Sequence, residues 1–167
     1  MPAFISSSIP APAQCVEHAG HQGAALEIDP LRFAESAQNA AGEYALESLT
    51  RLHDLLLSRS GALRWSIEGG RMDGRPVLHV RVDGELTLIC QRCLGPYVWS
   101  VQVRSTLPVA RDEAQLRQWE CDDPLLDALV AEPRLSVHEL IEDEVLLSLP
   151  PVVRHPHGTC MLCGVPS

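Results

Sequence analysis

The chain has 167 residues, a length that fits a single domain on the usual prior of about 100–200 residues. Apolar residues make up 46% of it and aromatic residues only 4%, so a core would be built mainly from Leu, Val, Ile and Ala, and no apolar run approaches the roughly 18 residues of a membrane span. The 13 basic residues, all arginine, stand against 22 acidic ones, and the net charge of -9 predicts a field that repels RNA and attracts basic partners, unless a local arginine cluster overrides it.

The N-terminal segment is rich in Ser, Pro, Ala and Gly and shows no hydrophobic period. We predict that residues 1–25 form a flexible extension and that residues 26–167 form a single domain. The extension has neither a positive n-region nor a continuous apolar stretch, so it does not resemble a secretory signal, and we expect a cytoplasmic protein. In a reducing compartment, paired cysteines indicate metal binding or catalysis more often than disulfides.

Leucines spaced by three and four residues predict a helix over residues 43–58, closed by Gly61 just past its end. The residues of this predicted stripe are Leu46, Leu49, Leu52, Leu56 and Leu57.

From Leu63 the hydrophobic period changes to two, which predicts antiparallel strands through residues 63–67, 78–88 and 98–107. Residues 72–75 have the composition of a turn between the first two strands. Asp83-Gly84 allows two interpretations, a tight hairpin turn or a bulge within one long strand with Gly84 at positive φ.

Three further elements are predicted toward the C-terminus. Residues 112–119 form a short helix candidate and residues 125–130 a short strand or extended run. Ser136 and Glu139 have the spacing of a capping box, which predicts a helix that Pro150-Pro151 ends. Its inward stripe is expected to be Val137, Leu140, Ile141 and Val145. The expected fold is α+β: an antiparallel meander or partly closed sheet with two to three flanking helices and a cysteine-rich knuckle.

Four acidic residues in the last helix suggest a solvated or partner-binding face, since adjacent carboxylates point in different directions around a helix and so make a poor catalytic pair. No nucleophile, general-base or phosphate-cradling pattern stands out, and no catalytic residue is predicted. The predicted partner-binding residues are Arg92, Glu139, Glu142, Asp143 and Glu144.

Two Cys-x-x-Cys pairs are the sharpest chemical feature of the sequence, Cys90 with Cys93 and Cys160 with Cys163. A two-residue spacing lets both thiolates of a pair bind one ion, and zinc prefers four such ligands in a tetrahedron. These four cysteines are therefore the predicted ligands of one structural zinc ion. Because the two pairs are far apart in the sequence, the fold must bring the chain end back to the first pair.

Alternatives to the four-cysteine site remain open at this stage. The thiol pairs could be unmetallated, and His155 or His157 could replace a thiolate, although we expect both histidines to be solvated loop residues. A redox role for Cys90 and Cys93 fits poorly, because thioredoxin-like pairs lie at a helix N-terminus, whereas strands flank this pair.

Several segments resemble the YceD family of bacterial large ribosomal RNA subunit accumulation proteins. The motif Cys-Gln-Arg-Cys-Leu-Gly-Pro at residues 90–96, with its approach at 84–88, is similar to that family's Cys-x-Arg-Cys-Leu segment. Residues 141–153 resemble its acidic helix and Leu-Pro-hydrophobic tail, followed by a His and a Cys, and residues 29–32 resemble its start. The likeness spans about residues 26–163. Many relatives continue into a Pro-Asn-Pro-Phe-like tail, whereas this sequence stops at Ser167.

The resemblance implies a non-enzymatic role in the synthesis, processing or stability of 23S rRNA. Three hypotheses compete at the molecular level. In the first, the acidic helix binds a basic ribosomal protein; in the second, Arg81, Arg92 and Arg104 contact ribosomal RNA; in the third, Cys90 and Cys93 act as a thiol oxidoreductase or as a zinc-dependent regulatory module. The oligomeric state is not predicted.

Overall fold

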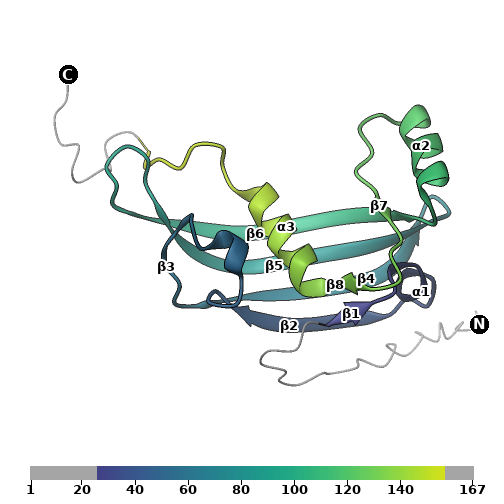
Figure 1. The fold of residues 1–167 in the computed structure, drawn as a ribbon, viewed down its shortest axis with the longest axis horizontal. Coiled ribbons are helices and arrows are strands. Elements are labelled where there is room, and N and C mark those ends of the chain that lie inside the picture. Colours follow the sequence, from purple (N-terminus) through teal and green to yellow (C-terminus); the bar gives the residue numbers. More distant parts are fainter. Residues whose placement is uncertain (1–25, 157–167) are drawn as a thin grey trace, which may run out of the picture.

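A computed structural model describes residues 26–156, which fold into an α+β arrangement built on a six-stranded sheet (Figure 1). The strand order is β2-β4-β5-β6-β7, and β3 pairs with β5 off this path. The elements of the sheet are β2 (Asn39–Ala45), β3 (Leu56–Ser58), β4 (Ala62–Met72), β5 (Arg75–Ile89), β6 (Pro96–Ala110) and β7 (Leu129–Val130). The remaining elements are β1 (Glu27–Ile28), α1 (Pro30–Glu35), the 3-10 helix η1 (Thr50–Leu52), α2 (Glu113–Asp122), β8 (Leu135–Ser136) and α3 (Val137–Ser148).

Strands β4, β5 and β6 form the predicted antiparallel meander. The turn between β4 and β5 consists of Asp73 and Gly74, both at positive φ, as a two-residue hairpin turn of type I′ requires. Strand β5 is continuous across Asp83 and Gly84, which pair with Gln102 and Val101 in unbroken register, so there is neither a tight turn nor a bulge at this point. Beyond Asp83, β5 exchanges its neighbour β4 for β3.

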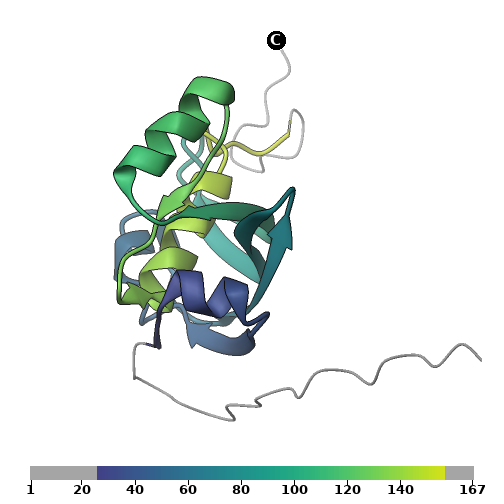
Figure 2. The same cartoon turned by 90° about the vertical axis from the view of Figure 1, so that its right-hand side faces the viewer.

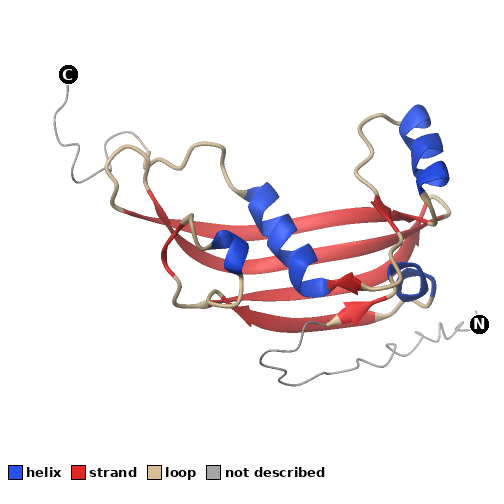
Figure 3. Ribbon diagram, in the orientation of Figure 1, coloured by secondary structure: helices blue, strands red, loops and turns tan. Residues whose placement is uncertain are grey.

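Within residues 26–156, α1 and α3 cover one face of the sheet. Figure 3 shows α3 lying across the strands, and the end-on view in Figure 2 places α1 and α3 on the same side of the sheet. Alternate residues of β4, β5 and β6 are buried beneath these helices, as a period of two predicts. This buried face includes Leu63, Ile67, Leu78, Val80, Val82, Leu86, Leu88, Val101 and Val103.

Helix α3 begins at the predicted cap. The Glu139 N–H donates to Ser136 Oγ at 3.3 Å, which is the first bond of the capping box. The predicted inward stripe is confirmed, since Val137, Leu140, Ile141 and Val145 are all buried. Strand β8, which ends at the cap residue Ser136, pairs with β1 and so holds the start of the described chain against the start of α3.

The helix predicted over residues 43–58 is wrong. The segment contains the end of β2, then η1, then β3. Residues 39–45 hydrogen-bond along β4, and Leu56 pairs with Leu88 of β5, so sheet pairing overrides the helical spacing. Four of the five leucines are nevertheless buried in the core, because successive turns of the chain point them inward at a similar spacing. The fifth, Leu57, is 46% exposed.

The remaining elements agree with the predictions in outline. Helix α2 and strand β7 occur where a helix and a short strand were expected, and β7 runs parallel to β6. The described strands form an open path with β2 and β7 at its ends, so the partial closure that we allowed for is not found there. No helix in residues 26–156 has the length and apolarity needed to cross a membrane. The predicted extension, residues 1–25, lies outside the described residues.

Candidate metal centre

The first cysteine pair lies in the loop that joins β5 to β6, residues 90–95, which we call the cysteine loop. The strands pair up to Ile89 and Pro96, and the Cys90 N–H donates to the Gly95 carbonyl at 2.9 Å to close the loop. The Leu94 N–H donates back to the Cys90 carbonyl at 2.8 Å, with Leu94 in the left-handed region at φ 59. This tight turn brings the thiol of Cys93 back toward that of Cys90.

The segment after α3 returns to the cysteine loop. Leu149-Pro150 ends the helix, and the Gln91 N–H then donates to the Val153 carbonyl at 2.8 Å. This bond places His155 beside the loop, with its ring edge-to-face with Tyr97 at a centroid distance of 5.3 Å. Two segments that are distant in the sequence therefore meet at the end of the β5–β6 hairpin, as Figure 1 shows.

Three potential metal ligands gather at this meeting point. One ligand atom from each of Cys90, Cys93 and His155 lies within 4.8 Å of the others, and Cys93 Sγ is 3.6 Å from His155 Nδ1. A thiolate and an imidazole nitrogen bound to the same tetrahedral zinc ion would be about 3.5 Å apart, given Zn–S near ~2.3 Å and Zn–N near ~2.0 Å. The described part of the chain therefore supplies three donors of the types that zinc prefers.

The orientation of His155 suits a ligand. Its Nε2 lies 2.9 Å from the Pro96 carbonyl, which can only accept a hydrogen bond, so Nε2 carries the proton. In the neutral ring the lone pair is then on Nδ1, the atom that faces Cys93. Hydrogen bonding of the non-ligating nitrogen to a backbone carbonyl is a common way to orient a metal-bound histidine.

The Cys90 thiol is buried and has an altered acidity. Desolvation by burial raises its pKa, but hydrogen bonds from the backbone N–H groups of Cys93, His155 and Arg92 and from the Cys93 thiol outweigh it and lower the pKa to about 6. At neutral pH the thiolate is therefore the favoured form of Cys90. A thiolate is the form that binds a metal.

The structure corrects our expectation that His155 is a solvated loop residue rather than a candidate ligand. His155 is half-buried and belongs to the cluster with Cys90 and Cys93. The signal that could have located it is Val153, a hydrophobic residue after the proline pair that packs against the core and draws the following residues inward. The predicted ligands Cys160 and Cys163, and His157, lie outside the described residues.

The predicted acidic face is also corrected in part. Glu142 and Glu144 are 2% and 7% exposed, so they are not members of a solvated surface. Glu142 Oε1 accepts the Arg51 N–H at 3.1 Å, while Glu144 accepts the hydroxyl proton of Ser105 on β6. Both carboxylates thus connect α3 to its neighbours inside the protein.

The other two acidic residues of α3 remain accessible. Glu139 is exposed, and Asp143 is half-exposed in an ion pair with Arg51. Partner binding by these two residues remains a prediction.

The predicted RNA-contacting arginines differ in their surroundings. Arg81 is 3.5 Å from Glu68, and Arg104 is 2.7 Å from Asp83, so both are ion-paired on the uncovered face of the sheet. Arg92 is exposed in the cysteine loop, where Leu94 is 74% exposed beside it. The cysteine loop thus presents an exposed cation and an exposed apolar side chain in the same turn that carries Cys90 and Cys93.

Together, the fold and the site define a small α+β protein whose longest hairpin ends in a Cys-Cys-His cluster. Residues 78–166, more than half of the chain, match the family described as "Large ribosomal RNA subunit accumulation protein YceD". The chain belongs to the YceD family, as its motifs indicated. A relative from Haemophilus influenzae that bears the same name is 26% identical over 147 residues, which cover 81% of this chain and 78% of the relative. No solved structure matches the chain.

Proposed function

We propose that this chain is a non-enzymatic accessory factor of ribosome biogenesis that supports the accumulation of 23S rRNA in the cytoplasm. The observation that carries the proposal is the family match over residues 78–166, since both the family and the Haemophilus influenzae relative are named for accumulation of large-subunit ribosomal RNA. The factor would act as an adaptor, bound to a ribosomal protein or to the RNA of an assembly intermediate.

The Cys-Cys-His cluster at the cysteine loop supports this proposal. Zinc on Cys90, Cys93 and His155 would need one further ligand, and Cys160 or Cys163 is the expected donor, because both follow His155 closely in the sequence. The ion would supply no catalysis here; with four protein ligands it would hold the loop and the chain end together. Arg92 and Leu94 would then be presented to a partner from a rigid base.

The thiol oxidoreductase alternative has less support. Catalytic Cys-x-x-Cys pairs use the dipole at a helix N-terminus and expose the attacking thiol. Here the pair lies in a β-hairpin, and Cys90 has 0% of its surface exposed. The lowered pKa of Cys90 serves metal ligation equally well.

The proposed function is tested in a strain that lacks the gene. We expect a lower ratio of 23S to 16S rRNA and a smaller large-subunit peak in sucrose gradients, both restored by the wild-type gene. Cys90→Ser should fail to restore the ratio, whereas Cys121→Ser, which changes an exposed thiol of α2, should restore it. An unchanged rRNA ratio in the deletion strain would refute the function.

The fourth ligand is tested by elemental analysis of the purified full chain. We expect about one zinc per chain for the wild type. Of the two variants Cys160→Ser and Cys163→Ser, one should lose zinc and the other should keep it. Zinc content that neither substitution changes would remove this second pair from the site.

A further inference from the structure

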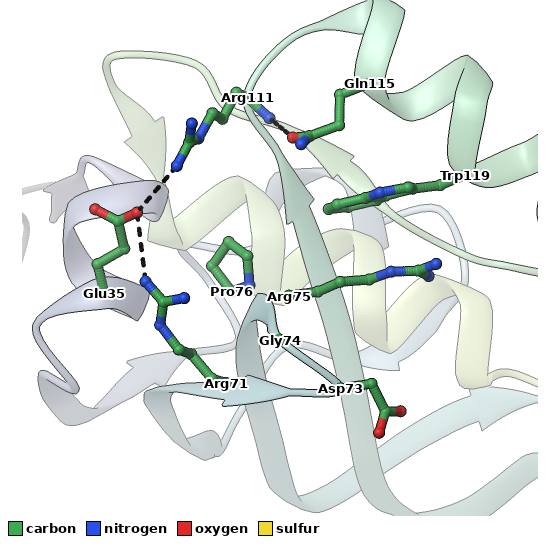
Figure 4. A pocket seen from close by; sticks show the side chains of 9 residues that line it. All are labelled: Glu35, Arg71, Asp73, Gly74, Arg75, Pro76, Arg111, Gln115 and Trp119. Carbon is green, nitrogen blue, oxygen red and sulfur yellow. Dashed lines mark hydrogen bonds and ion pairs between the residues drawn. The ribbon is translucent and has the colours of Figure 1, made fainter.

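A second chemical site lies at the other end of the long strands, where β4 turns into β5 and β6 runs into α2. Here a pocket of about 330 Å³ is lined by three of the chain's arginines together with a tryptophan (Figure 4). That volume is at the lower end of the ~300–1,000 Å³ typical of ligand sites. The residues that the argument uses, called the arginine pocket below, are Glu35, Arg71, Arg75, Arg111, Gln115 and Trp119.

One side of the arginine pocket is charged. Glu35 lies between two guanidinium groups, 3.7 Å from Arg71 and 3.8 Å from Arg111, and Figure 4 shows both arginines reaching toward its carboxylate. Both distances are near the limit of an ion pair, and the side chains are between 42% and 69% exposed, so these pairs are weak and open to exchange. A carboxylate held between two arginines occupies the place that a phosphate group could take.

The other side of the arginine pocket is aromatic. The guanidinium carbon of Arg75 lies 4.7 Å from the centroid of the Trp119 ring, and Trp119 is half-buried rather than part of the core. The first turn of α2 is fixed to this side, because the Arg111 N–H donates to Gln115 Oε1 at 2.8 Å. An accessible indole with a guanidinium on its face is a platform on which a base can stack.

The local charge of the pocket opposes that of the whole chain. The lining contains three arginines and two carboxylates, Glu35 and Asp73, and Figure 4 shows Asp73 pointing away from the pocket. With a net charge of -9, the chain as a whole repels polyanions, so any attraction for a phosphate must be local. A short segment of nucleic acid fits that limit better than an extended duplex does.

From this arrangement we infer that the arginine pocket binds one nucleotide of single-stranded RNA, with its phosphate between Arg71 and Arg111 in place of Glu35 and its unpaired base stacked on Trp119. RNA would engage both sides of the pocket, whereas the phosphate of a phosphorylated peptide would engage only the arginines. The inference rests on the proposed function, to which it adds the chemical class of a partner. It differs from the earlier hypothesis, which placed RNA on Arg81, Arg92 and Arg104.

Fluorescence anisotropy of the full chain with a labelled oligoribonucleotide of about 10 residues tests the inference, a length typical of single-strand sites. The double variant R71Q/R111Q should weaken binding at least tenfold, and W119L by about tenfold. Single-strand affinity should fall with salt at a slope of about -0.7 for the one phosphate held between the two arginines, and the double variant should flatten this dependence.

The variant Glu35→Gln sharpens the test. Removing the carboxylate that competes for Arg71 and Arg111 should raise RNA affinity, a result that a merely structural role for Glu35 would not produce. Arg81→Gln is the matched control, since Arg81 is also paired with a glutamate but lies on the uncovered face of the sheet, and it should leave affinity unchanged. Binding that is lost with Arg81→Gln and retained in R71Q/R111Q would overturn the inference.

A measurement on the wild type avoids any folding defect of the variants. The chain has three tryptophans, and of these Trp65 is buried in the core. On titration with the oligonucleotide, the indole N–H resonance of Trp119 should shift while that of Trp65 stays in place. Inorganic phosphate is the control for charge alone: if phosphate binds and the oligonucleotide does not, the base-stacking part of the inference is wrong.

The two proposals fail separately. If the wild type does not bind the oligonucleotide but loss of the gene still lowers the 23S rRNA ratio, the pocket inference is wrong and the proposed function stands. If the oligonucleotide binds as expected but the rRNA ratio is unchanged in the deletion strain, the proposed function is wrong.

Discussion

The cysteine loop and the arginine pocket lie at opposite ends of β5, and their side chains are held in different ways. At the cysteine loop the candidate metal ligands are held in place: Cys90 is buried, His155 is oriented by the Pro96 carbonyl, and backbone bonds close the loop. At the arginine pocket Glu35 and its two arginines are exposed and joined only by long ion pairs. Fixed donors suit a permanent metal ion, whereas loosely paired cations suit a ligand that comes and goes.

The comparison predicts that a substitution at one end changes metal binding or RNA binding there and leaves the other end unaffected. The largest effect is expected from Cys90→Ser or from removing zinc with a chelator. Zinc present at about 1,000 times its Kd would stabilise the fold by about 4 kcal/mol, and that stabilisation should disappear. Denaturant unfolding with and without zinc measures it, and oligonucleotide affinity should change little.

The control for this first prediction is Cys121→Ser, whose thiol is exposed on α2 near the opposite end. It should keep the zinc-dependent stability of the wild type. If zinc does not alter the unfolding curve of the wild type, the cysteine loop is not a metal site and the contrast between the two ends is lost.

The next effect is expected at the arginine end, from Gly69→Ala. A Cβ on Gly69 would lie 2.3 Å from the Phe33 carbonyl oxygen in α1, and backbone cannot move aside cheaply. We expect a loss of about 1–3 kcal/mol and, because α1 carries Glu35, an altered RNA affinity with zinc content unchanged.

The neighbouring substitution Gly70→Ala is a close control for Gly69→Ala. Its Cβ would meet nothing closer than His79 Nε2 at 3.6 Å, which is ordinary van der Waals contact. Equal unfolding midpoints for the two variants would show that α1 is not packed against β4 as described.

A smaller loss of stability is expected from Ser136→Ala, which lies between the two ends of the sheet. This change removes the oxygen that accepts the Glu139 N–H at the start of α3 and should cost about 1 kcal/mol in chemical denaturation. Because α3 packs across the middle of the sheet, both zinc content and RNA affinity should remain. Ser136→Asp, which keeps a capping oxygen, should recover most of the loss.

The smallest effect is expected from Glu144→Gln and depends on pH. Desolvation raises the pKa of Glu144, nearby Asp127 and Asp143 raise it further, and the Ser105 hydroxyl partly offsets them. The folded state therefore holds the proton more tightly than the unfolded state, so this residue's contribution to stability is present at low pH and is lost as pH rises through the raised pKa.

Replacing that carboxylate with an amide should make stability less dependent on pH over this window, and the variant should gain relative to the wild type toward neutral pH. Thermal unfolding of both proteins from pH 4 to pH 8 measures the difference. A wild type that becomes more stable than Glu144→Gln as pH rises would contradict the sign.

Local patterns predicted the parts of this molecule whose structure is decided locally. The alternation at Leu63, Trp65 and Ile67 and the capping spacing at Ser136 correspond directly to β4 and α3. The leucines of residues 43–58 misled us because their spacing is compatible with both a helix and a series of turns, and pairing with distant strands decides between them.

The candidate sites also combine features that the local sequence predicts with features that depend on distant contacts. The Cys-x-x-Cys spacing located Cys90 and Cys93, but the approach of His155 depends on how the segment after α3 folds back onto a distant hairpin. Burial of Glu142 and Glu144 depends on which face of α3 meets Arg51 and Ser105, and no local signal identifies those contacts. The arginine pocket combines α1, the β4–β5 turn and α2, which no local pattern relates to one another.

The unbroken course of β5 has a mechanical consequence. Its 15 residues, at ~3.3 Å each, form a spacer of roughly 50 Å between the Cys-Cys-His cluster and the arginines. A macromolecule that binds both ends at once must have two binding sites at about that separation. A precursor particle in which those two sites are not yet at that separation would bind the protein at one end only, and with lower affinity.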